Sequence, residues 1–244
     1  MCTSINGGGN DNNKNSKKSN YMHGHNHEQS LVKELIYHFP YAVFAITLSL
    51  AVISFFSFDS HGCDSMHSSR AGILFHSFHF MHILFSVTGT LVTYYRFSKG
   101  LLRGFFVGIF SAMVFCTLSD AVMPYIAGRL LGVDMCFHLC FFHELHNIVP
   151  FLVIGLVNGM VIGYFHKSNE VFYSVFSHFL HILVSSFASM FYLIANGFEN
   201  WYTQIGMVSL FLLVAVVVPC IMSDIVTPMT FAKVEKKNER NKVK

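Results

Sequence analysis

The sequence predicts an all-α membrane protein of six transmembrane helices, built as two inverted-topology repeats of three helices (3+3), with both termini inside. Composition predicts the membrane class. Of the 244 residues, 53% are hydrophobic and only 12% are charged, which is about half the charged fraction of a soluble domain. The charges also lie between long apolar runs, as they do in membrane proteins. An internal duplication predicts the repeats.

Six apolar windows are each long enough to cross a bilayer, which requires about 20 helical residues. Residues 1–30 are expected to form a disordered, polar, His-containing cytoplasmic tail, and residues 231–244 a basic cytoplasmic tail. Between them, residues 31–130 make up the first repeat and residues 131–230 the second. The predicted spans are 39–58, 72–95, 104–128, 145–165, 171–196 and 204–228.

The distribution of Lys and Arg predicts the orientation. With six spans and an inside N-terminus, 14 of the 16 basic residues fall on the inside, which is the bias of cytoplasmic loops. The short loop 96–103 carries this argument, because Arg96, Lys99 and Arg103 all lie next to the spans. We therefore expect a multi-pass protein of a cytoplasmic membrane, either inner or plasma.

Three segments recur in the same order, at offsets of 110, 99 and 104 residues. The middle pair has six identities in eight positions and carries a His-x-x-His motif in both copies. Because each copy has three spans, an odd number, the second copy must enter the membrane from the opposite side. Such inverted repeats are typical of secondary transporters. The matched segments are 34–43 with 144–153, 79–86 with 178–185, and 116–124 with 220–228.

Many of the recurring positions are ionisable, and an ionisable group inside a bilayer is a functional candidate because it is costly to bury. Histidines three residues apart share one face of a helix. Imidazole with carboxylate is a ligand set for zinc, nickel, cobalt, iron(II) or manganese. Residue positions along each helix predict one cluster towards each membrane face. The outer candidate ligands are His79, His82, Asp120 and Glu144, and the inner ones are His178, His181, Asp224 and Glu34.

Each copy also places a Cys four residues before its Asp, a Ser immediately before it and a Pro four residues after it. The Cys would soften the cluster towards zinc. The Pro has no N–H, so it is expected to break the helix and to free the backbone carbonyl of the Asp. These secondary positions are Cys116, Ser119 and Pro124 in the first copy and Cys220, Ser223 and Pro228 in the second, while His76 extends the first histidine face.

Histidine and cysteine also gather outside the spans, where such tracts have a metal-binding composition. These segments would concentrate metal at the mouths of a pore. No disulfide framework is predicted, and a pairing of Cys63 with either Cys136 or Cys140 stays open. The residues concerned are 22–27 in the N-terminal tail, His61, Cys63, Asp64 and His67 in one outer loop, and Cys136, His138, Cys140 and His143 in the other.

Together these features predict a transporter of divalent transition-metal ions, with zinc as the leading substrate, that works by alternating access between the two halves. No catalytic role, organic cofactor or nucleic-acid partner is expected. The partners are the lipid bilayer and the metal ions, and a homo-oligomer is left open. In type, the combination resembles features found among zinc and nickel or cobalt transporters, and it transfers no residue assignment from them.

Four other interpretations of the same residues stay open. Histidines on facing helices would also bind b-type haem in an electron-transfer protein. A zinc-dependent intramembrane hydrolase would use His and Asp to hold zinc and activate water. Proton-coupled transport of an organic solute would use these groups only as proton carriers. The polar groups would otherwise serve as structural hydrogen bonds between helices.

Overall fold

The computed structural model of the chain describes residues 36–37, 39–56, 69–138, 144–165, 170–198 and 200–242. The chain divides into residues 1–37 and 38–244, and the architecture below is that of the second part. Some predicted positions lie outside the described residues: Glu34, the tract 22–27, the loop residues 61–67, Cys140 and His143.

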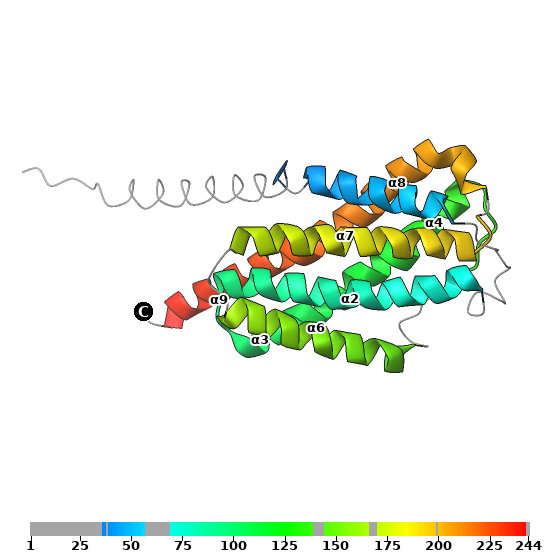
Figure 1. Cartoon of the computed structure of the whole chain (residues 1–244). Coiled ribbons are helices and arrows are strands. Elements are labelled where there is room, and N and C mark those ends of the chain that lie inside the picture. Colours follow the sequence, from blue (N-terminus) through cyan, green and yellow to red (C-terminus); the bar gives the residue numbers. More distant parts are fainter. Residues whose placement is uncertain are drawn as a thin grey trace, which may run out of the picture. The chain divides into compact units, whose positions relative to one another are not determined.

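Every regular element in the described part of the chain is a helix (Figure 1). Labels follow the figure. The elements are Phe39–Ser54, α2 (Arg70–Phe97), α3 (Leu101–Thr117), η2 (Leu118–Val122), α4 (Met123–Leu130), α6 (Leu145–Phe165), α7 (Glu170–Ala195), η3 (Trp201–Gln204), α8 (Ile205–Ile221), η4 (Met222–Val226) and α9 (Thr227–Lys242).

Five helical segments of the described chain are long and apolar enough to cross a bilayer, and Phe39–Ser54 is apolar but shorter. Apolar side chains face outwards at four-residue intervals along α6, as at Val149, Val153 and Val157, whereas many Ser, His and Asp side chains are buried. This distribution suits a bundle whose outer surface is solvated by lipid. Length and composition therefore mark the chain as an integral membrane protein of bundled helices.

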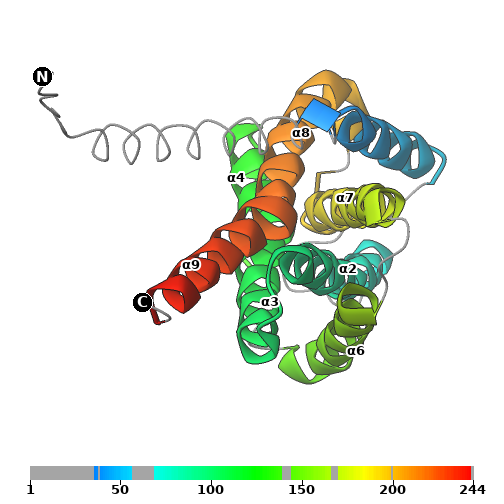
Figure 2. The same cartoon turned by 90° about the vertical axis from the view of Figure 1, so that its left-hand side faces the viewer.

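Helix α2 occupies the middle of this bundle. It packs most extensively against α7, α6 and α3, as the end-on view in Figure 2 makes clear. Three glycines at four-residue intervals let α6 approach it closely: a Cβ on Gly155 would lie 2.8 Å from Leu84 O, and one on Gly159 would lie 2.8 Å from Leu91 Cβ. Small residues at such spacing are a common means of close helix packing in membranes.

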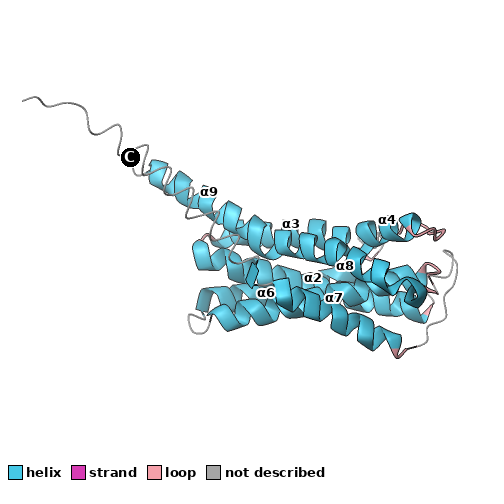
Figure 3. Ribbon diagram, turned by 90° about the horizontal axis from the view of Figure 1, so that it is seen from above, coloured by secondary structure: helices cyan, strands magenta, loops and turns pink. Residues whose placement is uncertain are grey.

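Two long helices are each interrupted by a five-residue π-helical segment. α3, η2 and α4 run consecutively from Leu101 to Leu130, and α8, η4 and α9 run from Ile205 to Lys242. In Figure 3, α9 continues beyond the end of the bundle. Each π segment contains one of the two recurring aspartates and is followed within two residues by a Pro. Prolines are a usual cause of such breaks, and π segments are frequent at functional sites.

The last helix extends further than the predicted span 204–228. Residues 231–242, expected to be a solvated tail, continue α9. The carboxylate of Glu235 is buried and accepts hydrogen bonds from the hydroxyls of Tyr94 and Ser98 and from Arg103 Nη1. The charge pattern of the tail predicts solvent exposure, but these partners stabilise Glu235 against α2 and the start of α3.

Candidate intramembrane metal centre

The first copy of the recurring residues forms a compact triad. His79 Nδ1 and His82 Nδ1 lie 2.8 and 2.6 Å from the same oxygen, Oδ2 of Asp120. The two histidines share a face of α2 because they are three residues apart, and Asp120 is presented by η2. A carboxylate only accepts, so both Nδ1 atoms donate; in a neutral ring this leaves the Nε2 lone pair available.

The second copy forms the same triad from α7 and η4. His178 Nδ1 and His181 Nδ1 lie 3.1 and 2.6 Å from Oδ2 of Asp224. Each of the six residues in the two triads is at most 4% exposed. The structure therefore brings together six of the eight candidate ligands, in two groups that use the same atoms.

The remaining first-copy candidates lie elsewhere. Glu144 stands immediately before α6, where its carboxylate accepts a hydrogen bond from Asn147 Nδ2, and no group of metal-ligating atoms in the described chain includes it. Its counterpart Glu34 lies outside the described residues. His76 Nδ1 lies 2.7 Å from Gly72 O in its own helix, and its ring packs against Phe80.

The two triads adjoin each other inside the bundle, and the placement of one towards each face of the membrane stays a prediction. The ring centroids of His82 and His181 are 4.5 Å apart, and Ser185 Oγ donates to Asp120 Oδ1 at 2.8 Å. Helices α2 and α7 pack extensively against each other, and the second histidine of each motif meets its counterpart there. The polar groups consequently form one network inside the bundle.

Hydroxyl groups link the two halves through the π segments. Thr90 Oγ1 on α2 donates to Ser223 O at 3.1 Å, and Ser189 Oγ on α7 donates to Ser119 O at 3.0 Å. Thr90 and Ser189 correspond at the offset of 99 residues, and Ser119 and Ser223 at the offset of 104. The same contact is thus made twice, each time from one half to the other.

The backbone carbonyls that accept these hydrogen bonds belong to Ser119 and Ser223. The sequence predicts that the Pro frees the carbonyls of Asp120 and Asp224, which lie one residue further along the chain. In the first π segment, Met123 N–H bonds Leu118 O, five residues back. In the same register Pro124 would face Ser119 O, and it has no N–H to give. The second segment repeats this pattern, since Thr227 N–H bonds Met222 O and Pro228 would face Ser223 O. The backbone carbonyls that lose their helical hydrogen bond are therefore those of Ser119 and Ser223.

The two aspartates differ in their second oxygen. Asp120 Oδ1 lies 2.8 Å from both Ser119 Oγ and Ser185 Oγ. Asp224 Oδ1 is buried and has no hydrogen-bond partner among the described residues. Asp224 and His178 line a cavity of about 20 Å³ together with Gly89, Val92, Thr93, Ser177 and Ile225. That volume holds one water molecule or a small ion.

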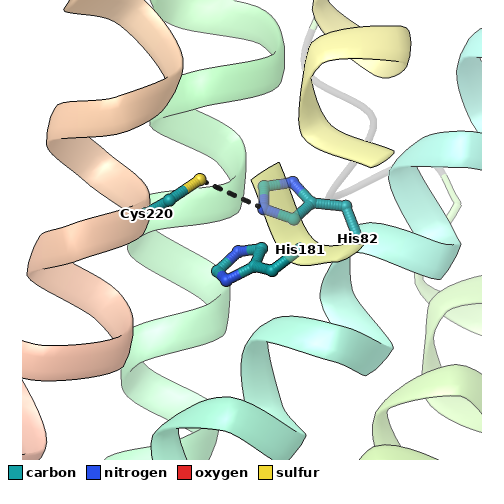
Figure 4. A group of neighbouring side chains, drawn as sticks. All are labelled: His82, His181 and Cys220. Atoms are coloured by element: carbon teal, nitrogen blue, oxygen red, sulfur yellow. Dashed lines mark hydrogen bonds between the residues drawn. The ribbon is translucent and has the colours of Figure 1, made fainter. Parts of the chain in front are cut away.

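A cysteine completes a second grouping at the junction of the triads. His82, His181 and Cys220 each offer a ligand atom within 4.8 Å of the others, as do His178, His181 and Asp224. Figure 4 shows the first group, in which Cys220 Sγ lies 3.8 Å from His82 Nε2. Cys220 is a predicted secondary position beside Asp224, and in the structure its Sγ also contacts His82, a histidine of the other half.

The corresponding cysteine, Cys116, differs from Cys220 in its ligand contacts. It is buried in an apolar cluster that includes Phe80, Ile83 and Val87, and it belongs to no ligand group among the described residues. Both cysteines are free, whereas Cys136 in the loop after α4 is disulfide-bonded.

Comparisons with known protein families, with characterised proteins and with solved structures find no match to this chain. The geometry of its buried His and Asp groups is compatible with metal binding.

Proposed function

We propose that the protein transports divalent transition-metal ions across its membrane by alternating access between two three-helix halves, with zinc as the leading substrate. One observation carries this proposal: each half holds two imidazoles on one buried carboxylate through their Nδ1 atoms. Ligand histidines in metal sites are typically held in this way, with a carboxylate on one ring nitrogen and the metal on the other.

A purely structural role explains the arrangement less well. Burying an aspartate inside a bilayer is costly, and a single hydrogen bond between helices would need only one histidine or one serine. Here two carboxylates and four imidazoles gather in one network with His82 and His181 in ring contact. The cost is easier to understand if the network binds a cation.

The two halves fit the proposed inverted repeat. Within each half, the histidines bond the aspartate; between halves, a hydroxyl on one side bonds a carbonyl of the other π segment. A pseudo-two-fold axis relating two inverted copies would generate each contact twice, as in other inverted-repeat transporters. The N-in, C-in orientation remains a proposal that rests on the basic residues of loop 96–103.

The unequal access to the two aspartates fits one state of an alternating cycle. Asp120 is enclosed by two hydroxyls, whereas Asp224 borders a small cavity near Thr93. Thr93 lies in the last turns of α2, whose end leads into loop 96–103. In the proposed orientation, that cavity lies towards the cytoplasmic side.

Two rival functions fit this geometry less well. The rings of His82 and His181 are 4.5 Å apart, so no porphyrin fits between them as it would between the two axial ligands of a b-type haem. A hydrolase acting on lipid would need a substrate-sized opening beside its zinc, and the cavity at Asp224 has a volume of about 20 Å³.

Zinc uptake into proteoliposomes tests the proposal. We expect the double variant His82→Ala/His181→Ala to reduce uptake to the background of empty vesicles, because it removes one imidazole from each triad. His146→Ala is the matched control, since His146 is exposed on α6 and uptake should be unchanged. Unchanged uptake in the double variant would overturn the assignment.

A further inference from the structure

We infer that His82, His181 and Cys220 form one central cation site, whose two imidazoles and one thiolate select zinc-like cations over oxygen-preferring ones such as Mn²⁺ or Mg²⁺. The inference deepens the proposed transport function, and it rests on that function only in identifying the bound cation as the transported ion. The three residues come from α2, α7 and α8, so the site stands where the two halves meet.

The spacing suits a tetrahedral ion. With metal–nitrogen bonds of about 2.0–2.1 Å and a metal–sulfur bond of about 2.3 Å, ligand atoms lie roughly 3.3–3.7 Å apart around zinc. Cys220 Sγ and His82 Nε2 are already 3.8 Å apart. The whole group lies within 4.8 Å, so small side-chain shifts bring all three atoms to bonding distance.

The imidazole nitrogens are prepared for a cation. His82 and His181 each donate Nδ1–H to an aspartate at 2.6 Å, which fixes the tautomer and directs a lone pair from Nε2. His181 is fully buried, and its Nε2 has no hydrogen-bond partner among the described residues. A buried acceptor without a partner is costly, and a cation held by His82 and Cys220 would satisfy it.

The donor set gives the selectivity. Thiolate is a soft ligand that favours zinc or copper(I), imidazole suits zinc, copper, iron and nickel, and Mn²⁺ and Mg²⁺ prefer oxygen. Three protein ligands leave one coordination position open, so a fourth ligand can exchange. His181 also belongs to the group with His178 and Asp224, which connects the central site to the cavity beside Asp224.

The duplication supplies a matched control. Cys116 and Cys220 occupy corresponding positions, four residues before each aspartate, and both are buried and free. Only Cys220 belongs to a ligand group in the described chain. Equal substitutions at the two positions therefore separate ligation from simple packing.

Cobalt(II) titration of the purified full-length protein in detergent tests this site without requiring transport. We expect a thiolate-to-cobalt charge-transfer band in wild type that zinc abolishes and magnesium does not. The band should persist in Cys116→Ser and be absent in Cys220→Ser and Cys220→Ala. Zinc affinity should fall at least about tenfold in both Cys220 variants, since loss of an outer partner alone costs 10–100-fold.

Several outcomes would overturn the inference: a band that survives in Cys220→Ser, a band that is lost equally in Cys116→Ser, or equal displacement by magnesium. Cys220→Ala keeps a small apolar side chain, and circular dichroism verifies that it is folded. A sulfur-containing site with no zinc uptake into proteoliposomes would sustain this inference and overturn the transport proposal. Zinc uptake that is unaffected by Cys220→Ser would sustain the transport proposal and overturn this inference.

Discussion

The two His–His–Asp triads have the same internal bonds and different surroundings. Asp120 has both carboxylate oxygens engaged, one by two histidines and the other by two serines. Asp224 uses one oxygen for its histidines and leaves the other beside a small cavity. A duplicated sequence motif can therefore hold one carboxylate with both oxygens hydrogen-bonded and one carboxylate that has a buried oxygen without a partner among the described residues and that borders a small cavity.

The corresponding serines Ser185 and Ser86 explain part of this difference, because they have different hydrogen-bond partners. Ser185 on α7 donates to Asp120 Oδ1, whereas its counterpart on α2, Ser86, pairs with Ser223 Oγ at 2.8 Å. The second contributor is Gly89, since a Cβ at that position would lie 3.0 Å from Asp224 Oδ2. The corresponding residue in the second copy is Ala188, which is buried. The two copies thus differ by one methyl group and by the partner of one serine hydroxyl.

Replacing each aspartate by its isosteric amide should give the largest difference between the triads. Asp120→Asn leaves four donors facing a group that accepts poorly, and removing one partner from a buried charged group costs about 3–5 kcal/mol. Asp224→Asn disturbs only two donors, so we expect a cost of about 2–3 kcal/mol. Thermal unfolding of both variants in detergent measures the difference. Equal losses of stability would mean that the two carboxylates are equally satisfied.

Filling the cavity beside Asp224 should affect uptake more than stability. Gly89→Ala places a methyl group against the carboxylate, and we expect zinc uptake to fall about tenfold, which corresponds to roughly 1.4 kcal/mol. Ala188→Gly is the counterpart variant, and it should lower stability by about 1 kcal/mol through helix propensity alone with uptake retained. If Gly89→Ala transports zinc as wild type does, access at Asp224 does not pass through this cavity.

Removing the hydroxyl of Ser185 should make the triad of Asp120 resemble the triad of Asp224. Ser185→Ala deletes a donor to Asp120 Oδ1, and we expect a loss of about 1–3 kcal/mol because the acceptor is charged. Ser86→Ala deletes a bond between two neutral hydroxyls and should cost about 1 kcal/mol or less. Parallel unfolding measurements rank the two. The reverse order would show that Asp120 does not depend on Ser185.

The smallest effect is expected at the end of α9. Glu235→Gln weakens the contacts to Tyr94, Ser98 and Arg103, and it should cost about 1–2 kcal/mol while zinc uptake stays within about twofold of wild type, a change of roughly 0.4 kcal/mol. Lys236→Gln, at an exposed neighbour, serves as control. A large loss of uptake in Glu235→Gln would mean that the anchoring of α9, and not the triad itself, governs access to Asp224.

The apolar runs were sufficient to predict the helices. The residue spacing pointed to the six side chains that meet in the two triads, but the predicted clusters also included Glu144, which lies elsewhere, and Glu34, which lies outside the described residues. His79 with His82, and His178 with His181, share helix faces because of the 3.6-residue period, which is a local property of the chain. Asp120 and Asp224 recur four residues before a Pro, in the same order as the two histidine motifs. This recurrence indicated that the aspartates are the partners of the histidines. The inverted arrangement and the orientation remain predictions from the repeat and from the basic residues.

The register and the contacts between helices could not be obtained in this way. A π turn moves the freed carbonyl from Asp120 to Ser119, and nothing in local spacing distinguishes a bond five residues back from one four residues back. The meeting of His82 and His181 depends on how α2 packs against α7, which the glycines and side-chain volumes of the whole bundle decide together. The inequality of Cys116 and Cys220 has the same origin, because two corresponding positions in a duplicated chain have different neighbours once the halves pack against each other.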